Sequence, residues 1–514
     1  AREEHVPVLI HVLELTQPQG HSTSGSHERY KNPERLAWEA KQDCNLKIRE
    51  WIIENGISTN EALTEIERTI KRDVRVARKN AWTTFLKPIQ KEQQELLSIL
   101  KQVASSSANG VFISKLKDSL AKMGEPTRKD ILSHARKCLR YTIGETSSEK
   151  KQLANWINSV FENAQPKFSS HLYSETNRSN ILIKEVKPTY NDDAPQVDGR
   201  IILRDNFEAL FNNYPEVLVF GEDTGNIGDV NQGLEGLQEK FGKFRVTDTG
   251  IREATIVGQG IGMALRGLRP IAEIQYLDYI LYALQIISDD LATTHYRTKG
   301  KQKAPLIIRT RGHRLEGIWH SGSQMGGILN LMKGVHILVP RNMTKAAGFY
   351  NTLLQGDDPA LVVECLNGYR LKEKMPTNLG DIKTPIGIVE TIKEGTDITL
   401  VSYGSTLRIV EQTAKDLLTV GIDAEVIDVQ SLIPFDLNHD IAKSIEKTNR
   451  VMIIDEDVPG GASAYILNEI LNTQNAYQHG NDGDYFSKPS PDDIFEAIYA
   501  IMYELNPTDF PKLR

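Results

Sequence analysis

The stretch VLVFGED, residues 217–223, opens the part of the chain whose pattern decides the fold. An unbroken apolar run ends in a glycine and two acids, which is typical of a buried strand of a parallel sheet. Four similar runs follow it: PIAEIQ (270–275), PLIIRT (305–310), VHILVP (335–340) and PALVVE (359–364). The segments between these runs are long enough for helices. Because strands and helices alternate, the sequence predicts a parallel sheet that is covered by helices on both faces.

A second α/β unit is predicted from about residue 385. Its expected strands are DITLVSYG (397–404), DAEVIDVQSL (423–432) and RVMIIDED (450–457). Ser405 stands where it can cap a helix over 406–420, and Gly421 stands where it can end that helix. Since crossovers between parallel strands are right-handed, this part of the chain is predicted to form a compact three-layer domain.

Residues 33–150 are predicted to be helical. Ser58 and Glu61 fit a capping box at the start of a long helix, and Gly56 fits the end of the preceding helix, 42–54. Along the long helix, apolar side chains recur at spacings of three and four: Leu63, Ile66, Ile70, Val74, Ala77 and Ala81. This spacing predicts an apolar stripe on one face of the helix.

The N-terminal stretch PVLIHVLEL (7–15) predicts a buried strand, and TQPQGHSTSGSHERYK (16–31) predicts a polar loop. The chain has no starting Met, and domains seldom begin on an interior strand. We therefore expect this chain to start inside a longer one.

The composition is that of an ordinary globular protein. The 514 residues carry a formal net charge of −7, which gives no reason to expect nucleic-acid or membrane partners. No apolar run approaches the roughly 18 residues of a membrane-spanning helix. The three cysteines lie far apart in the sequence, without the spacing of metal ligands or of a disulfide framework. This usage favours a reducing compartment, so we expect a cytoplasmic protein.

One acid, Glu253, stands at the start of an apolar helix in TDTGIREATIVGQGIGMALRG (247–267). One interpretation is that Gly250 caps this helix and Glu253 is an acid of the first turn, where the helix dipole favours it. The helix also contains three glycines: Gly258, Gly260 and Gly262. Each glycine costs a helix about 1 kcal/mol relative to alanine, so they indicate the close approach of a backbone or a ligand. The spacing of these glycines is not G-x-G-x-x-G and no clear strand leads directly into them, which disfavours a dinucleotide-binding loop.

Polar side chains follow the predicted strands near this helix. They are two acids, an amide, a phenol and an imidazole: Glu222, Asp223, Gln275, Tyr279 and His320. Ligands of open parallel sheets bind outside the carboxyl ends of the strands. We therefore expect these side chains to converge with Glu253 at one edge of the sheet.

These motifs carry a family resemblance. G-E-D-x-G, I-x-E before a Gly/Ala helix, E-I-Q-x-x-D-Y and H-S follow one another between about 200 and 470. In this order they resemble the β subunits of thiamine-diphosphate-dependent 2-oxo acid dehydrogenases, in the transketolase-like group. The N-terminal segment 7–31 resembles the end of the α subunit's cofactor domain, and the helical stretch resembles the α subunit's C-terminal tail. The chain is thus similar to fused α and β subunits that lack the N-terminal part of the α domain.

The resemblance implies an α/β, transketolase-like fold. It has a three-layer pyrimidine-binding domain with a parallel sheet and a transketolase C-terminal domain, preceded by the helical α-subunit tail. The implied domains are a diphosphate-binding remnant (1–30), the tail (31–145), a linker (146–199), the pyrimidine-binding domain (200–375) and the C-terminal domain (376–514).

The resemblance also implies residue roles. Glu253 would hydrogen-bond the aminopyrimidine ring of thiamine diphosphate and so activate the cofactor. His320 would act near the 2-oxo acid and the lipoyl entrance. His21, in a loop that closes over the active site, would orient the cofactor and stabilise the acyl-carrying intermediate. The other cofactor-binding positions are Glu222, Ile251, Gln275 and Tyr279. Two simpler interpretations stay open: Glu222 as a strand-end acid in a polar loop, and Tyr279 as a core side chain. His313 stays a loop histidine, and nothing in the sequence indicates phosphorylation of Ser22 or Ser24.

The resemblance implies two cofactors, thiamine diphosphate and Mg²⁺. The family holds the diphosphate and Mg²⁺ through G-D-G followed by a distant Asn in the α domain, and this chain has no such motif. NDGDYF (481–486) is rejected as a substitute because it lies in a polar loop near the C-terminus. We therefore expect no metal ligands here and place them in the missing N-terminal part.

The implied activity is the oxidative decarboxylation of a 2-oxo acid, with transfer of the acyl group to the lipoyl group of a dihydrolipoyl acyltransferase. EIQYLDYI (273–280) resembles branched-chain enzymes, which act on acids such as 3-methyl-2-oxobutanoate. A pyruvate enzyme, a non-catalytic assembly fragment and a transketolase-like synthase are the alternatives. The fused chain is expected to form a homodimer through the glycine helices.

Overall fold

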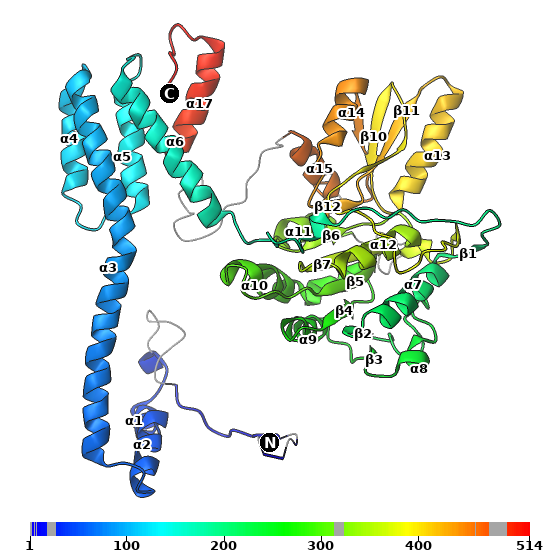
Figure 1. Cartoon of the computed structure of the whole chain (residues 1–514), viewed down its shortest axis with the longest axis horizontal. Coiled ribbons are helices and arrows are strands. Elements are labelled where there is room, and N and C mark those ends of the chain that lie inside the picture. Colours follow the sequence, from blue (N-terminus) through cyan, green and yellow to red (C-terminus); the bar gives the residue numbers. More distant parts are fainter. Residues whose placement is uncertain are drawn as a thin grey trace. The chain divides into compact units, whose positions relative to one another are not determined.

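The computed structural model describes residues 3–4, 6, 8–17, 27–312, 323–457, 459–471 and 491–513 (Figure 1). The chain divides into two compact units. One comprises Ala1–Asn158 together with Pro489–Arg514, and the other is Ser159–Lys488. The second unit contains both α/β regions that the sequence predicts.

The first unit is helical, as predicted for 33–150. Its α4 and α5 pack against α3 and against each other. The α-helices are α1 (Pro33–Lys41), α2 (Cys44–Glu54), α3 (Asn60–Ser106), α4 (Gly110–Ala121), α5 (Arg128–Tyr141), α6 (Ser148–Phe168), which continues into the second unit, and α17 (Pro491–Leu505). Arg136 pairs with Glu496 of α17, with 2.6 Å between Nε and Oε1. The structure therefore groups α17 with this helical unit, whereas the sequence placed it in a domain spanning 376–514. The domain boundaries themselves stay predictions.

The start of α3 differs from its prediction by one residue. The N-cap is Thr59, whose hydroxyl accepts a hydrogen bond from the Ala62 N–H at 3.2 Å. The predicted capping box of Ser58 and Glu61 is therefore wrong. Gly56 has a left-handed backbone with φ +66°, as expected for a glycine that follows a helix.

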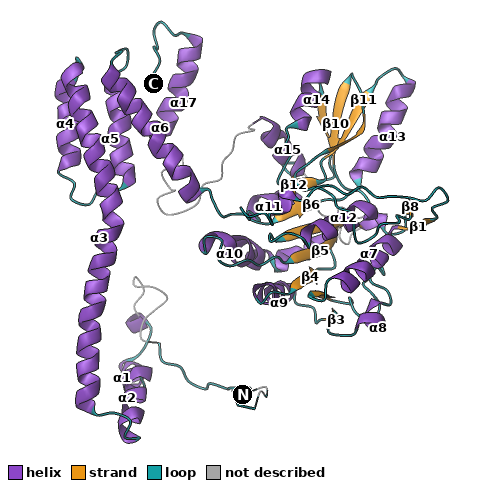
Figure 2. Ribbon diagram, viewed as in Figure 1, coloured by secondary structure: helices purple, strands orange, loops and turns teal. Residues whose placement is uncertain are grey.

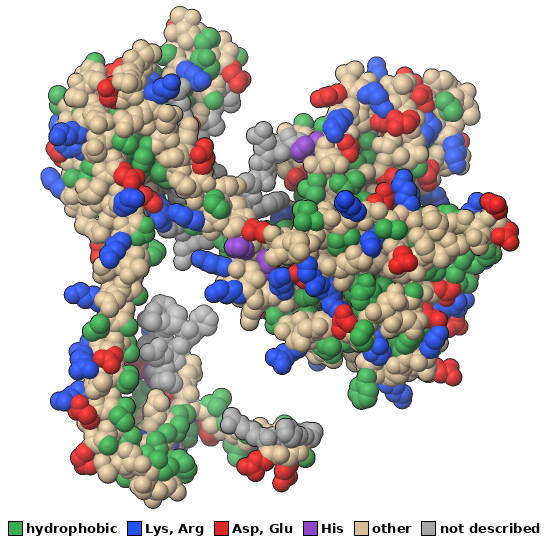
Figure 3. Space-filling model, in the orientation of Figure 1, with side chains coloured by type: hydrophobic (Ala, Val, Ile, Leu, Met, Phe, Trp, Pro, Cys, Tyr) green, Lys and Arg blue, Asp and Glu red, His purple; other side chains and the backbone are tan. Residues whose placement is uncertain are grey.

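The predicted apolar stripe of α3 does not form a core within the described residues. Ile70 and Val74 are 54% and 60% exposed, and Figure 3 shows apolar side chains along this part of the helix. The C-terminal half is different, because Leu96, Leu100 and Val103 are fully buried. The helix is therefore fixed by packing at one end only.

One N-terminal prediction is wrong. Residues 8–17 form no strand, and Leu9 is 95% exposed. A strand is stable only when it pairs with a neighbour, and none of the described strands pairs with this stretch.

The segment 146–199, which the sequence predicts to be a linker, includes the 21-residue helix α6. The linker itself stays a prediction.

The seven-stranded sheet contains all five strands predicted after residue 200 (Figure 2). Its order is β12-β6-β7-β5-β4-β2-β3, and only β12 runs antiparallel to its neighbour. The strands are β2 (Val217–Gly221), β3 (Val246–Asp248), β4 (Arg269–Glu273), β5 (Ile307–Gly312), β6 (His336–Leu338), β7 (Ala360–Cys365) and β12 (Ser431–Ile433). The predicted parallel sheet is confirmed.

Helices cover both faces of this sheet. Leu218 and Phe220 of β2 pack in one core, and Val217 and Val219 pack in the other, because side chains alternate along a strand. The first core includes α9 (Glu253–Leu265), α10 (Ala292–Arg297) and α11 (Met325–Leu331). The second includes α7 (Gly199–Asn213), α8 (Leu237–Phe241) and α12 (Met343–Leu353). The three-layer arrangement is confirmed.

The second α/β region forms a four-stranded sheet of order β13-β10-β11-β9. The three strands predicted there are β10 (Ile398–Ser402), β11 (Ala424–Asp428) and β13 (Val451–Ile453). The antiparallel edge strand β9 (Glu390–Lys393) was not predicted. The helices of this region are α13 (Thr406–Thr419), α14 (Asp440–Thr448) and α15 (Ala462–Leu471). Ser405 precedes α13 as predicted, but its side chain makes no capping hydrogen bond.

Short elements complete the description. The strands β1 (Gln196–Asp198) and β8 (Lys372–Lys374) form an antiparallel pair. The remaining short helices are η1 (His27–Arg29), η2 (Asn180–Leu182), η3 (Leu277–Tyr282), η4 (Ile286–Leu291) and η5 (Leu366–Gly368). None of the helices described combines the length and apolar character needed to cross a membrane.

Candidate active site

Three neighbouring strands bring the candidate residues to one edge of the sheet. Glu222 follows β2, Gln275 lies just beyond β4, and the loop after β3 leads to Glu253. Since β4, β2 and β3 are adjacent and parallel, their carboxyl ends lie side by side. The predicted convergence is therefore found for the described residues. His21, His313, His320, Ser22 and Ser24 lie outside the described residues.

Glu253 is the first residue of α9. The helix begins one residue after Arg252, so Gly250 does not cap it and Glu253 is not its third residue, as one interpretation had it. The half-buried carboxylate is favoured at this position by the partial positive charge of the helix N-terminus. Four residues separate the end of the short strand β3 from the start of α9, so β3 does not lead directly into the glycines of this helix. With only three residues, β3 leaves a weak signal in the sequence.

Glu222 is half-buried beside two other acids. Burial raises the pKa of its carboxyl group, and the negative charges of Asp223 and Glu253 raise that pKa further. Repulsion between neighbouring carboxylates favours the protonated form of one of them. The edge of the sheet therefore holds a carboxyl group whose protonated form is more favoured than in an isolated glutamate.

Gln275 is buried, and both ends of the residue are held in place. Its side-chain Nε2 donates to Oδ2 of Asp223 at 3.1 Å, and its backbone carbonyl accepts from a guanidinium nitrogen of Arg311 at 3.0 Å. Asp223 itself has a left-handed backbone, with φ +56°. The Asp223–Gln275 hydrogen bond was not predicted from the sequence. The sequence feature that points to this hydrogen bond is the pair of acids, Glu222 and Asp223, directly after a buried strand.

Tyr279 and Ile251 complete the described part of the site. Tyr279 lies in η3 with its ring perpendicular to that of Tyr276, at 5.9 Å between the centroids. Its pKa is raised by burial and by nearby acids, with Asp278 contributing most among them. Ile251 is 69% exposed in the loop before α9. This loop therefore presents an apolar side chain to a ligand or to a partner.

A fully buried group of charges lies next to these residues. Arg309 donates to Asp229 at 2.8 Å, to Glu364 at 2.9 and 3.1 Å, and also to Glu273. Arg311 donates to Glu273 at 2.9 Å. We call these five side chains the buried ion cluster. Because Arg311 also binds the Gln275 carbonyl, the cluster fixes the end of the strand that carries the site.

The buried ion cluster has three carboxyl groups for two guanidinium groups. Burial raises the pKa of Glu273, although Arg311 and Arg309 oppose that rise. The hydroxyl groups of Tyr350 and Tyr369 both donate to Glu364. Sequence reasoning missed this cluster. The sequence feature that could have revealed it is the presence of two arginines, Arg309 and Arg311, in a strand predicted to be covered on both faces.

Removing the charge of Asp223 tests the electrostatics of this edge. In Asp223→Asn we expect the pKa of Glu222 to fall, because a negative neighbour that raises it is gone. The asparagine keeps an oxygen that can accept from Gln275. Carbon-detected NMR titration of the Glu222 carboxyl would measure the shift, with the exposed Asp192→Asn as the control. An unchanged or higher pKa of Glu222 would contradict this electrostatic account.

The arrangement suits hydrogen bonding to a polar ring. Carboxylates, a fixed amide and a phenol can donate to, accept from and exchange protons with the nitrogen atoms of a heterocycle. Among the described residues, no group of three or more His, Cys, Asp or Glu side chains is placed to hold a metal ion.

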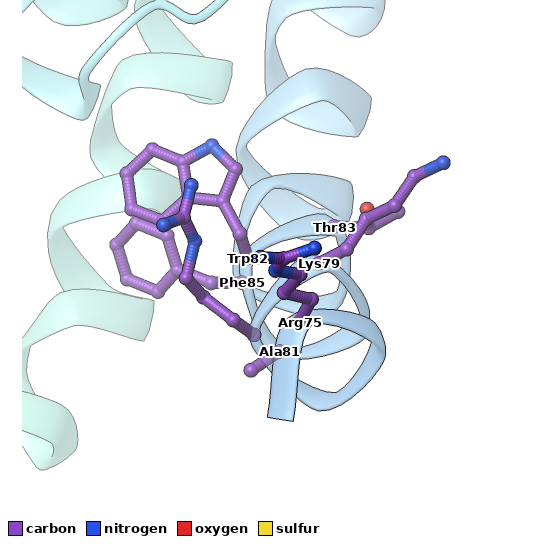
Figure 4. A pocket seen from close by; sticks show the side chains of 7 residues that line it. Arg75, Lys79, Ala81, Trp82, Thr83 and Phe85 are labelled. Atoms are coloured by element: carbon purple, nitrogen blue, oxygen red, sulfur yellow. The ribbon is translucent and has the colours of Figure 1, made fainter. Parts of the chain in front are cut away.

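A hollow of about 1160 Å³ lies in the helical unit (Figure 4). Its described lining comes from α3 and includes Arg75, Arg78 and Lys79. Trp82 and Phe85 stack on each other there, at 5.5 Å between the ring centroids. The described lining contains no carboxylate or imidazole, and its charged groups are all cationic. The candidate active site is therefore the edge of the seven-stranded sheet.

The fold and this edge define a class of protein. Residues 196–370 match the family described as the transketolase pyrimidine binding domain, and residues 387–483 match the transketolase C-terminal domain. Both matched segments fall in the unit that carries the two parallel sheets. The protein is therefore transketolase-like, as the sequence predicted.

Proteins with similar sequences identify a particular family within this class. Over 285 residues the chain is 34% identical to subunit beta-4 of the chloroplastic pyruvate dehydrogenase E1 component of Oryza sativa subsp. japonica, covering 54% of this chain and 70% of that one. It is also 34% identical, over 256 residues, to two bacterial proteins. They are the pyruvate dehydrogenase E1 component subunit beta of Staphylococcus epidermidis (49% of this chain, 78% of that one) and the 2-oxoisovalerate dehydrogenase subunit beta of Bacillus subtilis (49% and 76%).

The chain belongs to the family of E1 β subunits of the thiamine-diphosphate-dependent 2-oxo acid dehydrogenases. These matches span about half of the chain. The resemblance stated from the sequence motifs is confirmed at the level of the family.

Proposed function

We propose that this protein decarboxylates a 2-oxo acid with thiamine diphosphate and passes the acyl group to the lipoyl group of a dihydrolipoyl acyltransferase. The observation that carries the proposal is the meeting of Glu253, Glu222 and Gln275 at the carboxyl edge of the pyrimidine-binding sheet. Membership of the E1 β family supports the same activity.

The residues at this edge fit the aminopyrimidine end of the cofactor. Thiamine diphosphate, when bound, supplies the electron sink that decarboxylation of a 2-oxo acid requires. Glu253 would accept and return a proton at the ring, from the N-terminus of α9. Gln275, fixed by Asp223, would orient the ring through its amide. Glu222 would hold a proton nearby because its pKa is raised.

Magnesium is proposed as the partner of the cofactor's diphosphate group. Mg²⁺ prefers hard oxygen ligands, which phosphate and carboxylate groups supply. We also propose that His320 and His21 act near the substrate and the lipoyl group, which follows from their positions in the sequence motifs. We propose the cytoplasm as the location, since the three cysteines are free, as expected in a reducing compartment.

The substrate is proposed to be a branched-chain acid such as 3-methyl-2-oxobutanoate, because residues 273–280 resemble branched-chain enzymes. Pyruvate is the second candidate, favoured by relatives that are subunits of pyruvate dehydrogenases. A few pocket side chains decide between such acids, so the similarity of whole chains does not decide it.

Turnover of the full-length protein on both acids tests the function. We expect carbon dioxide release with thiamine diphosphate and Mg²⁺, and kcat/KM at least about tenfold higher for 3-methyl-2-oxobutanoate than for pyruvate. A reversed ratio would favour the pyruvate enzyme. No turnover of either acid, with acyltransferase binding retained, would favour a non-catalytic assembly piece. Activity without acyltransferase binding would favour a transketolase-like synthase.

A homodimer is proposed to form through α9. Gly258 and Gly262 lie four residues apart on an exposed face of α9, and a Cβ added at either would meet no atom within 4 Å. Gly260 differs from them, because its added Cβ would lie 2.6 Å from Cδ1 of Leu306 in the same chain. We therefore restrict the predicted close packing between copies to Gly258 and Gly262.

Bulky side chains at these two glycines test the dimer. We expect Gly258→Leu and Gly262→Leu to convert the dimer to a monomer, because two backbones that pack closely leave no room for leucine. Light scattering coupled to size-exclusion chromatography would measure the mass. Thr413→Leu, on an exposed face of α13, is the control. A dimer that survives both glycine substitutions would rule out this interface.

A further inference from the structure

A second cavity lies in the Ser159–Lys488 unit. It has a volume of about 440 Å³ and is formed by four parts of the chain that are distant in sequence. Most of its lining comes from the end of α6 and the segment after it, which contribute side chains between Gln165 and Ile181. The rest comes from α10, from the start of β6 and from the loop after β12: Tyr296, His336, Pro434 and Leu437.

This cavity is separate from the candidate active site. His336 is the first residue of β6, and Asp358 lies two residues before β7. Both therefore stand at the amino ends of parallel strands, whereas Glu222 and Gln275 stand beyond the carboxyl ends. The two sites are at opposite edges of one sheet.

His336 is the polar group that needs an explanation here. Its residue is 1% exposed, and Tyr173 stacks on its ring at 4.8 Å with the planes 8° apart. Its Nε2 faces Oδ2 of Asp358 at 3.6 Å, and neither ring nitrogen has a protein group within hydrogen-bonding distance. Buried polar groups in proteins are nearly always hydrogen-bonded, so an imidazole without a partner in a cavity wall indicates a ligand.

The surroundings of His336 indicate which of its nitrogens is open to a ligand. Burial alone would raise the pKa of Asp358, but the attraction of His336 and hydrogen bonds from the backbone of Ser174 and Asn180 outweigh it and lower that pKa. Asp358 is therefore ionised, and it favours a proton on Nε2. Nδ1 of the neutral ring is then an acceptor. The hydroxyl of Ser169, which lines the same cavity, is also buried without a protein partner.

The lining also constrains the charge of a ligand. The described lining has no lysine or arginine, and its one described carboxylate, Glu175, pairs with His171 at 3.4 Å. Most of the wall is apolar or aromatic: Phe168, Leu172, Tyr173, Ile181, Tyr296, Pro434 and Leu437. An anion would find no opposite charge there apart from the imidazole, which Asp358 already faces. The cavity thus combines an apolar wall with one or two hydrogen-bonding positions, as small-molecule sites usually do.

We propose that this cavity binds an uncharged small molecule with an aromatic or branched apolar body and one hydroxyl or N–H group. That group donates to Nδ1 of His336. The apolar body lies against the segment that follows α6. The proposal is independent of the decarboxylase function, because the site uses none of the same residues.

Three matched probes test the proposal on the unmodified full-length protein with thiamine diphosphate and Mg²⁺ present. Indole has an N–H donor, benzofuran has the same shape without the donor, and indole-2-carboxylate adds a negative charge. We expect indole to bind about tenfold more tightly than benzofuran, the typical value of one hydrogen bond to a buried group. Indole-2-carboxylate should bind more weakly than indole. Isothermal titration calorimetry would measure all three.

A substitution at His336 tests whether this residue makes the hydrogen bond to the probe. In His336→Phe, which keeps an aromatic ring against Tyr173, we expect indole and benzofuran to bind equally. Equal binding of the two to the unmodified protein, no binding of indole below millimolar concentration, or tightest binding of indole-2-carboxylate would each overturn the proposal. The probes need no variant, so the proposal stays testable even if His336→Phe fails to fold.

Discussion

Glu253→Gln should abolish measurable decarboxylation while the protein stays folded. Glutamine keeps the size and an acceptor oxygen of the side chain but can neither hold nor release a proton at the cofactor ring. Proton transfer by a positioned side chain contributes about 10²–10⁴-fold to a rate, and we expect a loss in turnover of this order. The loss should appear in kcat, since the substitution removes proton transfer while it keeps the size of the side chain.

Turnover of 3-methyl-2-oxobutanoate by the full-length variant, with thiamine diphosphate and Mg²⁺ added, measures this effect. Glu239→Gln is the matched control, because Glu239 is also an acid in the first turn of a helix, α8, but is exposed and outside the site. Circular dichroism would verify that both variants are folded. Near-normal turnover by the Glu253 variant would refute the role assigned to this acid.

Arg309→Met should strongly destabilise the α/β unit. Three carboxyl groups bind Arg309, and all of them are fully buried. Removing one partner of a buried ion pair leaves uncompensated charge and costs about 3–5 kcal/mol. Arg311 remains in the variant, but it binds only part of the cluster.

Hydrogen exchange of the β5 amides, read by mass spectrometry, isolates the response of this unit from that of the helical unit. In Arg309→Met, the free energy of opening measured at the β5 amides should fall by about 3–5 kcal/mol. Arg297→Met provides the control, because Arg297 pairs with Asp289 on the surface at 2.5 Å and more than half of each side chain is exposed. Exposed pairs contribute about 0–1 kcal/mol. A similar small effect for Arg309 would show that the buried ion cluster does not stabilise the sheet.

The central strands could be predicted because each contains a short run of apolar residues between turns. Short edge strands such as β3 and β9 could not, since their three or four residues become strands only by pairing with a neighbour. The same rule explains the wrong prediction for 8–17, where an apolar run has no described strand to pair with. Apolar pattern alone therefore identifies strands reliably only in the interior of a sheet.

The candidate site could be predicted in part for a related reason. Acids and amides directly after buried strands meet at one edge, so Glu222 and Gln275 were identifiable from position alone. The hydrogen bond between Asp223 and Gln275 could not be predicted, because it depends on how two neighbouring strands are placed relative to each other. The buried ion cluster was missed because charged residues in a strand suggest an exposed face. In this sheet both faces are covered, and Arg309 and Arg311 are buried.

The pairing of β12 with β6 has a mechanical consequence. Through Ser431 and Ile433, a segment that lies between β11 and α14 of the second α/β region continues the sheet of the first. Rotating the two regions apart about a hinge would break hydrogen bonds of a shared sheet, which makes such a movement costly. We therefore expect them to unfold as one cooperative block. Access to the candidate active site must then come from movement of loops and side chains.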